Sequence, residues 1–404
     1  MTQFCQTAIV GAGPYGLSLG AHLAAAGADF RIFGKAMDTW RHHMPKGMSL
    51  KSDGFATNIS APDSHSTLKT WSRLHGVPYD DRLVPVTLSN FNGYSTWFQK
   101  RHVPMLEEEM VVGLASGQRG FVLTLSNGEV LEAARVVLAV GITWFKNLPE
   151  ILEGLPAALV SHSYDHSDMT ALKGQDVLVL GAGSSAVDTA VLAAEAGAHV
   201  TLAGRRAAID YHSSPDPDAQ SWLQSIANPS TGIGPGWRSL FCAKAPNLFR
   251  HLPETLRLEA TRRHLGPATG WFMRGRLPEE MTRLGLSFEG AAVQGSKVSV
   301  SARRRDGKAI TLKADKVIAA TGFRPDLRRL TFLDEALRGG IAHVAHTPRL
   351  SAQFETSVPG LFVTGPMAAN AFGPLMRFMV GAEYAAPRLA QHLARGSRQM
   401  KAAA

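Results

Sequence analysis

The chain has 404 residues, of which 45% are hydrophobic, and its formal net charge is +9. This length allows two domains with separate cores, and no apolar run reaches the ~18 residues that a membrane-spanning helix needs. The first strand begins within a few residues of the N-terminus and leaves no room for a signal peptide, so we expect a cytoplasmic protein with no membrane contact.

The excess positive charge does not indicate a nucleic-acid-binding protein. Basic residues do not alternate with aromatic residues as in the known RNA- and DNA-binding modules. The short basic runs at residues 303–305 and 328–329 are expected to be solvated. We expect the charge to attract anionic cofactors and substrates.

The first predicted unit is a βαβ fold over residues 4–34. A strand at 7–10 leads into a G-x-G-x-x-G turn, and a second strand covers 29–33. This spacing is typical of a turn that holds a dinucleotide pyrophosphate at a helix N-terminus. Gly34 stands where a carboxylate usually binds the adenosine ribose, and Lys35 or a backbone group is expected to replace that contact. The residues that this turn contributes to the predicted cofactor site are Gly11, Gly13, Pro14, Tyr15 and Gly16.

Residues 37–60 are aromatic, basic and rich in turns, with the period of neither a helix nor a strand. Two interpretations stay open. Trp40, Met48 and Asn58 line a cofactor ring or a pocket, or the segment is a surface loop around a buried tryptophan.

The next segments are expected to complete the first domain. Residues 90–112 have the pattern of an amphipathic helix, and residues 120–141 that of a hairpin returning to the first sheet. In the linker at 142–175, His162 and His166 are one helical turn apart. No further metal ligands accompany them, so no metal site is predicted.

Residues 176–206, DVLVLGAGSSAVDTAVLAAEAGAHVTLAGRR, repeat the βαβ pattern and predict a second dinucleotide fold. The expected phosphate contacts are Gly181, Gly183, Ser184 and Ser185. The second strand ends on Arg205 and Arg206 instead of the usual acid. Because arginine pairs well with phosphate, these two residues favour NADPH over NADH.

Residues 207–275 do not continue the βαβ pattern and are expected to be a mainly helical insertion. It forms a substrate pocket or lid, or else a dimer contact. Its large aromatic residues are candidates for a pocket or for a core: Tyr211, His212, Trp222, Trp237 and Trp271.

The last third of the chain returns to strands between residues 286 and 320. A strand ending in Ala-Thr-Gly reaches Thr321 and Gly322, and a final strand covers residues 360–365. A helix opened by Gly373 and Pro374 should follow, because proline is well suited to a first helical position.

The two cysteines, Cys5 and Cys242, are far apart and form no Cys-x-x-Cys pair. We expect buried thiols that take no part in catalysis, which excludes a redox-active disulfide.

The motifs GAGPYG, GAGSSA, AATGF and GLFVTG, in this order, resemble the flavoproteins with two dinucleotide-binding domains. Within them, the chain is similar to the class B flavin monooxygenases: the flavin-containing monooxygenases, the YUCCA-type enzymes and the lysine or ornithine N-hydroxylases. The Trp40 and Gly-Met stretch, Thr57-Asn58 and His162-Ser163 match motifs of these enzymes. The family's Gly-Asp pair at the flavin is Gly365-Pro366 here.

The resemblance implies an α/β protein with two Rossmann-like domains. The FAD-binding domain comprises residues 1–160 and 316–404, the NADPH-binding domain 161–206 and 276–315, and the insertion 207–275. The implied FAD contacts outside the first turn are Lys35, Trp40, Met48, Thr321, Gly322, Gly365, Pro374 and Leu375.

The implied activity is an NADPH- and O2-dependent oxygenation of a small molecule through a C4a-hydroperoxyflavin, with Asn58 at the reacting edge of the flavin. Two alternatives remain. One is an FAD-dependent NAD(P)H oxidoreductase that passes electrons to a protein or quinone, and the other is a flavin-bound redox sensor of low turnover. Neither the substrate nor the oligomeric state is predicted.

Overall fold

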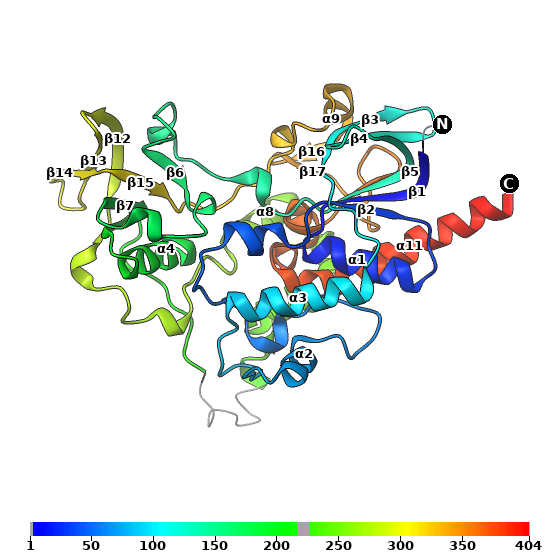
Figure 1. Ribbon diagram of the computed structural model, residues 1–404, viewed down its shortest axis with the longest axis horizontal. Helices are drawn as coiled ribbons and strands as arrows, with labels where there is room; N and C mark the ends of the chain where they lie inside the picture. Colours follow the sequence, from blue (N-terminus) through cyan, green and yellow to red (C-terminus); the bar gives the residue numbers. More distant parts are fainter. Residues whose placement is uncertain (1–2, 216–225, 404) are drawn as a thin grey trace.

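The computed structural model describes residues 3–215 and 226–403, which form two α/β lobes around two parallel sheets (Figure 1). The helices are α1 (Pro14–Ala25), α2 (Leu68–His75), α3 (Leu88–His102), α4 (Ser184–Glu195), α6 (Trp237–Lys244), α7 (Pro246–Phe249), α8 (Glu254–Arg263), α9 (Glu335–Gly340), α10 (Ala369–Phe372) and α11 (Ala382–Ala403). In these two stretches of chain, no helix has both the length and the apolar character required to cross a bilayer.

The strands of the larger lobe, on the right of Figure 1, are β1 (Gln3–Val10), β2 (Arg31–Phe33), β3 (Val111–Gly117), β4 (Gly120–Leu125), β5 (Val130–Leu138), β16 (His343–Val344), β17 (Thr347–Pro348) and β18 (Leu361–Val363). The strands of the smaller lobe are β6 (Val160–His162), β7 (Asp176–Leu180), β8 (His199–Gly204), β11 (Thr282–Leu284), β12 (Ser287–Gln294), β13 (Lys297–Arg303), β14 (Ala309–Ala314) and β15 (Lys316–Ala319). Two short strands, β9 (Ser230–Thr231) and β10 (Gly234–Pro235), lie in the insertion.

The first sheet has the order β2-β1-β5-β4-β3, and β18 pairs with β5. Its βαβ core is parallel, whereas β4 and β5 form the predicted antiparallel hairpin, and β3, which was not predicted, pairs antiparallel with β4. Successive residues of β1 alternate between two cores: Ile9 joins the core that contains α1, α3 and α11, and Ala8 and Val10 join the core with β3 and β4. The sheet is therefore buried on both faces, as its continuous apolar strands predict.

The second sheet is entirely parallel, with the order β11-β8-β7-β15-β6. Helix α4 covers one face, and the antiparallel sheet β12-β13-β14 covers the other. The predicted domain boundary at residue 316 is wrong, because β15 is hydrogen-bonded between β7 and β6. A parallel strand bonded on both edges belongs to the second sheet, so the chain returns to the first domain only after β15.

Helix α1 packs very closely against the sheet because two positions have no side chain. A Cβ on Gly16 would overlap the carbonyl oxygen of Gly11, and a Cβ on Gly11 would overlap that of Ala139 at the end of β5. The second fold repeats this contact, since a Cβ on Gly181 would come within 2.5 Å of the Ala320 carbonyl oxygen after β15. Both turns therefore bring a helix N-terminus to the carboxyl edge of a parallel sheet.

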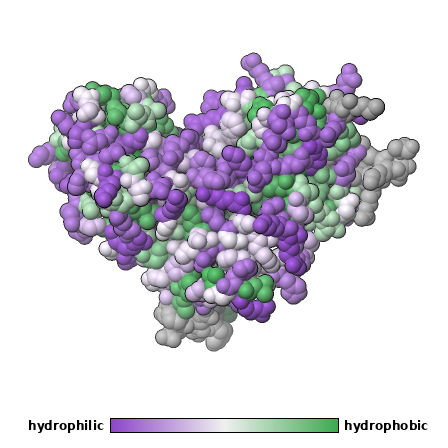
Figure 2. Space-filling view, in the orientation of Figure 1, coloured by the Kyte–Doolittle hydropathy of each residue, from purple (hydrophilic) through white to green (hydrophobic). Residues whose placement is uncertain are grey.

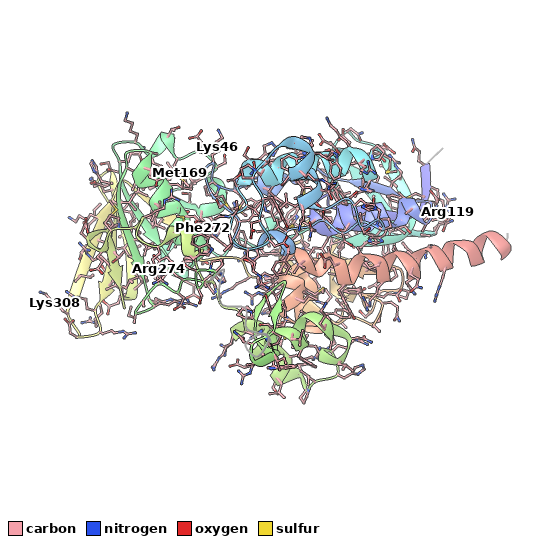
Figure 3. All side chains as sticks on the ribbon, turned by 90° about the horizontal axis from the view of Figure 1, so that it is seen from below. Lys46, Arg119, Met169, Phe272, Arg274 and Lys308 are labelled. Atoms are coloured by element: carbon pink, nitrogen blue, oxygen red, sulfur yellow. The ribbon has the colours of Figure 1, made fainter. Side chains whose placement is uncertain are left out.

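The described part of the insertion contains α6, α7 and α8 and lies against the C-terminal segments of the first lobe, as Figure 3 shows from below. The Arg257 guanidinium donates a hydrogen bond to the Asn370 carbonyl oxygen (3.0 Å), and the Thr261 hydroxyl donates one to that of Ala369 (3.2 Å). The expected helical character is present, and the insertion is anchored to the first lobe.

The helix predicted to begin at Pro374 is interrupted. Pro374 opens only a short 3₁₀ turn (Pro374–Arg377), and the long helix α11 begins at Ala382. Gly373 has φ +90°, and Phe378 is extended, so the backbone leaves the helical region on both sides of that turn. The sequence pattern was wrong here because tertiary contacts override a good N-terminal proline.

Two lysines of the segment 44–51 connect the first lobe to the second. Lys51 Nζ lies 2.7 Å from Asp188 Oδ2 on α4, and both side chains are largely buried. Lys46 Nζ lies 3.0 Å from Asp168 Oδ2, but this pair is exposed at the edge of the smaller lobe (Figure 3). Burial raises the pKa of Asp188, and the Lys51 ammonium opposes that rise.

We expect Lys51→Met to lower the free energy of unfolding by about 3–5 kcal/mol at neutral pH, because it leaves a buried carboxylate without a partner. Without Lys51, the pKa of Asp188 in the folded protein rises further above its unfolded value. The deficit relative to wild type therefore shrinks as the pH falls, and it is smallest below the unfolded pKa of about 4, where the carboxyl becomes protonated in both states. Urea titrations across this pH range measure the effect.

The matched control is Lys46→Met, which removes the same charge from the same segment. Because the Lys46–Asp168 pair is exposed and screened by solvent, the expected loss is much smaller than that of Lys51→Met, with little dependence on pH. Equal losses in the two variants would contradict a special role for the buried pair.

Candidate functional site

The turn before α1 fits a dinucleotide pyrophosphate. Gly13 is the N-cap residue of α1, and no protein atom lies within 4 Å of the position that its Cβ would occupy. The unpaired amides of the first helical turn face this space, where the helix dipole favours an anion. Lys35 is exposed just beyond β2, so its predicted ribose contact remains a prediction.

Tyr15 connects this turn to the C-terminal segment. Its buried hydroxyl lies 3.1 Å from the Met376 carbonyl oxygen and 2.8 Å from that of Phe378, and it donates to these acceptors. Its ring lies against Gly365, where a Cβ would be 3.4 Å away. Burial raises the pKa of Tyr15 and keeps the phenol neutral. The structure therefore brings the first turn together with Gly365, Pro374 and Leu375.

The predicted residues of the segment 37–60 are held by backbone contacts. The Trp40 ring centroid lies 5.7 Å from that of Phe91, within the first core, and the Met48 carbonyl accepts a hydrogen bond from the Leu88 amide (3.0 Å). The loop therefore packs against α3. These contacts agree with a loop packed around a tryptophan, and the predicted contact of Trp40 and Met48 with a cofactor ring stays a prediction.

Asn58, the predicted catalytic residue, uses its side-chain amide within the protein. Its Nδ2 donates to the Phe55 carbonyl oxygen, and its Oδ1 accepts from the Leu68 amide at the start of α2, both at 2.9 Å. One N–H remains for another acceptor. The catalytic role of Asn58 stays a prediction beside this observed role in fixing the loop.

The second Gly-rich turn has the expected backbone but a different neighbour. Gly183 is the N-cap residue of α4, and Ser184 and Ser185 begin that helix. A Cβ on Gly183 would lie 3.0 Å from Pro267 Cβ, so a proline of the insertion occupies the space above this turn. The Pro267 ring therefore lies beside the turn where the pyrophosphate is expected.

The structure separates the two arginines predicted to select NADPH. Arg206 donates from Nη1 to Asp210 Oδ2 (2.6 Å) and to the Pro267 carbonyl oxygen (3.3 Å), so it holds the segment above Gly183. Arg205 instead lines a cavity of about 350 Å³, together with Arg303, Arg304 and Arg305. The run 303–305 was expected to be solvated, and its position beside Arg205 was not apparent from the sequence.

Thr321 and Gly322 lie where the chain passes between the lobes. The Thr321 hydroxyl donates to the Asn147 carbonyl oxygen, and the Asn147 amide donates to that of Gly322 (3.0 Å). His162 Nδ1 accepts from the Tyr164 amide (3.1 Å), so its Nε2 carries the proton and donates to the Gly322 carbonyl oxygen (3.0 Å). These contacts join the chain segments that pass between the lobes. The contact predicted between a cofactor and Thr321 and Gly322 stays a prediction.

His166 is also engaged, because its Nε2 lies 2.7 Å from Ser161 Oγ. Burial lowers the pKa of both His162 and His166 and favours neutral rings. Across the described ranges, no three His, Cys, Asp or Glu side chains are grouped as metal ligands.

A second cavity of about 410 Å³ lies between the insertion and the C-terminal segment. Phe55 and Ala56 form one wall, and Leu375 forms another. Its polar side chains are those of Lys244, Glu383, Tyr384 and Arg388, together with those of Ser230 and Thr231. The sequence had indicated none of these polar residues.

The aromatic residues predicted to shape a pocket do not line this cavity. Tyr211 forms a β-bridge with Thr269, and Trp237 is 60% exposed on α6. Neither His212 nor Trp271 belongs to its lining. Trp222 lies outside the described residues.

Both cysteines are buried and form no disulfide, as expected. Burial raises the pKa of Cys5 to about 12 and also raises that of Cys242. Neither thiol is therefore set up as a thiolate nucleophile.

Comparison with known proteins identifies the family. Residues 8–231, more than half of the chain, match the family described as pyridine nucleotide-disulphide oxidoreductase. A stretch of 105 residues is 36% identical to a ferredoxin–NADP reductase from Ignicoccus hospitalis. That stretch covers 26% of this chain and 33% of the reductase, so the chain matches about a third of that relative's length.

Solved structures share the whole fold. An ornithine N-hydroxylase from Kutzneria sp. 744 has a TM-score of 0.76 and 15% identity, over 97% of this chain and 99% of that chain. A bacillithiol disulfide reductase from Staphylococcus aureus has a TM-score of 0.64 and 18% identity, over 98% and 99%. At these identities the likeness concerns the fold alone. The family match and the two Gly-rich turns at parallel sheets show that the chain belongs to the pyridine nucleotide-disulphide oxidoreductase family, as a flavin-dependent oxidoreductase that binds FAD and a pyridine nucleotide.

Proposed function

We propose that the protein is an NADPH- and O2-dependent FAD monooxygenase that oxygenates a small molecule. The observation that carries this proposal is the cavity of about 410 Å³, which reaches both the segment before Asn58 and Leu375. These are the two places where the resemblance to the monooxygenases expects the flavin ring. A small molecule in this cavity would therefore be held beside the flavin.

Bound FAD supplies the electron transfer and the reaction with oxygen, whereas the chain binds, orients and excludes water. In this proposal, the amides at the start of α1 bind the FAD pyrophosphate. The segment 37–60 packs against α3 and shields the ring site from water. Tyr15 keeps the C-terminal turn, with Pro374 and Leu375, at a fixed position relative to α1.

The polar side chains of the cavity favour a substrate that carries charge. Glu383 lines it, and burial raises the pKa of this carboxyl while the nearby Lys244 ammonium opposes the rise. The Arg388 guanidinium lies 3.8 Å from the centre of the Tyr384 ring. A carboxylate facing two cations suits a small amine that also carries an acidic group. L-Ornithine, the ligand of the Kutzneria enzyme, has this chemistry.

The thiols argue against a disulfide reductase. Such chemistry needs a cysteine that is reactive and close to the flavin, but Cys5 is buried in β1 and Cys242 in α6. The second candidate function is an NAD(P)H oxidoreductase that passes electrons to a protein or quinone. The matched third of the ferredoxin–NADP reductase and the engaged amide of Asn58 favour it.

The first test reduces the FAD-loaded protein with NADPH without oxygen and then mixes it with oxygenated buffer. A monooxygenase should show a delay before the spectrum of oxidised flavin returns. The reaction is then repeated with L-ornithine, L-lysine or cadaverine. If one of these is a substrate, NADPH oxidation should yield hydroxylated product in place of hydrogen peroxide. Immediate reoxidation, together with faster electron transfer to ferredoxin or a quinone, would instead support the reductase.

The cavity is tested with Glu383→Gln, which should abolish product formation while NADPH still reduces FAD. Glu335→Gln, on the exposed surface of α9, removes the same charge far from the cavity and serves as the control. Unchanged product formation in Glu383→Gln would remove this cavity from the proposal.

Pro267→Gly should tighten NADPH binding several-fold, because the proline ring occupies the space above Gly183. Isothermal titration of the FAD-loaded protein measures the change. Pro235→Gly, at an exposed proline of the same insertion, should leave the affinity unchanged. A weaker affinity in Pro267→Gly would mean that the segment supports the nucleotide instead of obstructing it.

A further inference from the structure

The cavity of about 350 Å³ beside β8 is surrounded by positive charge. Its lining includes four arginines, Arg205, Arg303, Arg304 and Arg305, and no acidic residue. Two of them reach acids outside the cavity: Arg303 Nε lies 2.7 Å from Glu289 Oε1, and Arg304 Nε lies 4.0 Å from Asp306 Oδ2. Within the described ranges, neither Arg205 nor Arg305 has an ion pair.

These arginines come from two different sheets. Arg205 follows β8 of the parallel sheet, whereas Arg305 lies in the turn between β13 and β14. That turn is closed by hydrogen bonds from the Arg304 amide to the Lys308 carbonyl oxygen and from the Gly307 amide to that of Arg304, both 2.9 Å. The position of Arg305 is therefore set by an ordered turn.

Gly285 brings the two elements together. Its amide donates to the Arg206 carbonyl oxygen (2.7 Å), which places it beside the exit of β8. The Arg305 side chain lies across it, with Nε 3.2 Å from the position that a Cβ on Gly285 would occupy. Because no side chain stands between them, Arg305 can approach the end of β8.

We propose that Arg205 and Arg305, assisted by Arg304, bind the 2′-phosphate of NADPH. The end of the second strand of a dinucleotide fold is where the adenosine ribose lies, and the usual acid is replaced here by Arg205. Guanidinium groups without a counter-ion repel one another, and a phosphate dianion offsets that repulsion with charge-assisted hydrogen bonds. In this proposal Arg205 and Arg305 select NADPH over NADH, and Arg206 holds the segment above Gly183 instead.

This inference rests on the proposed use of NADPH and is tested without turnover. The ligands are 2′,5′-ADP and 5′-AMP, which differ only in the 2′-phosphate, and their affinities are measured by isothermal titration of the FAD-loaded protein. Titrations are run on wild type and on Pro267→Gly, so that the segment above Gly183 does not mask binding.

We expect 2′,5′-ADP to bind at least roughly tenfold more tightly than 5′-AMP, as charge-assisted hydrogen bonds imply. Arg205→Gln and Arg305→Gln should each reduce the ratio of the two affinities, that of 2′,5′-ADP over that of 5′-AMP, towards one. Arg305→Lys should restore part of this ratio. Arg206→Gln should keep the ratio. So should Lys308→Gln, which removes a charge from the same turn at a residue that does not line the cavity (Figure 3).

The proposal is overturned if Arg305→Gln keeps the full ratio, or if Arg206→Gln is the variant that loses it. It is also overturned if the two ligands bind equally in wild type and in Pro267→Gly. These outcomes do not depend on oxygen, so a failure here leaves the monooxygenase proposal standing if NADPH still reduces FAD. A failure of the oxygen test equally leaves the phosphate site standing.

Discussion

The close contact between a helix and a sheet at two glycine-rich turns determines how the rest of the molecule is arranged. At Gly16 and Gly11, and again at Gly181, a single added methyl group would meet a backbone carbonyl that cannot move without disturbing a strand. Because interiors are close-packed, this contact fixes each helix to within a fraction of an ångström. The unpaired amides at the start of α1 and α4 are thereby held at the carboxyl edges of the two sheets, where nucleotides bind in such folds.

The two turns differ in what the remaining chain does to them. Tyr15 fastens the first turn to the C-terminal segment and leaves the space above Gly13 open. The insertion lies above Gly183, and its segment around Pro267 is hydrogen-bonded to both lobes. Arg377 donates to the carbonyl oxygens of Thr261 (3.0 Å) and His264 (3.2 Å) from the first lobe, and Arg206 holds Pro267 from the second. Figure 2 shows the two lobes separated by a notch at the upper edge of the view.

Local pattern was enough to predict both βαβ units, the β4–β5 hairpin and the start of α3, because their apolar periodicity agrees with their burial. The helix predicted over 90–112 was too long, since α3 ends at His102 and residue 111 already belongs to β3. It was not enough where distant segments decide the outcome. The helix expected at Pro374 is divided because the Met376 and Phe378 carbonyl oxygens accept from the Tyr15 hydroxyl and Gly373 leaves the helical region. Arg205 and Arg206 look equivalent in sequence, yet adjacent residues at a strand end point in different directions. Arg305 is near Arg205 only because the sheet β12-β13-β14 packs against the parallel sheet, which no spacing along the chain reveals.

The arrangement also implies an order of events for the pyridine nucleotide. The arginine cavity is open to solvent at the ribose end of the second turn, whereas Pro267 covers the pyrophosphate end. Long-range attraction acts on the phosphates before any close contact forms, and it acts most strongly where positive charge is uncompensated. If Arg205 and Arg305 bind the 2′-phosphate as proposed, the adenosine end is held first, and the pyrophosphate then competes with Pro267 for the amides of α4. Arg377, which lies in the same 3₁₀ turn as Leu375, donates to the carbonyl oxygens of Thr261 and His264, so a shift of the segment 264–270 would act on the wall of the cavity that Leu375 lines.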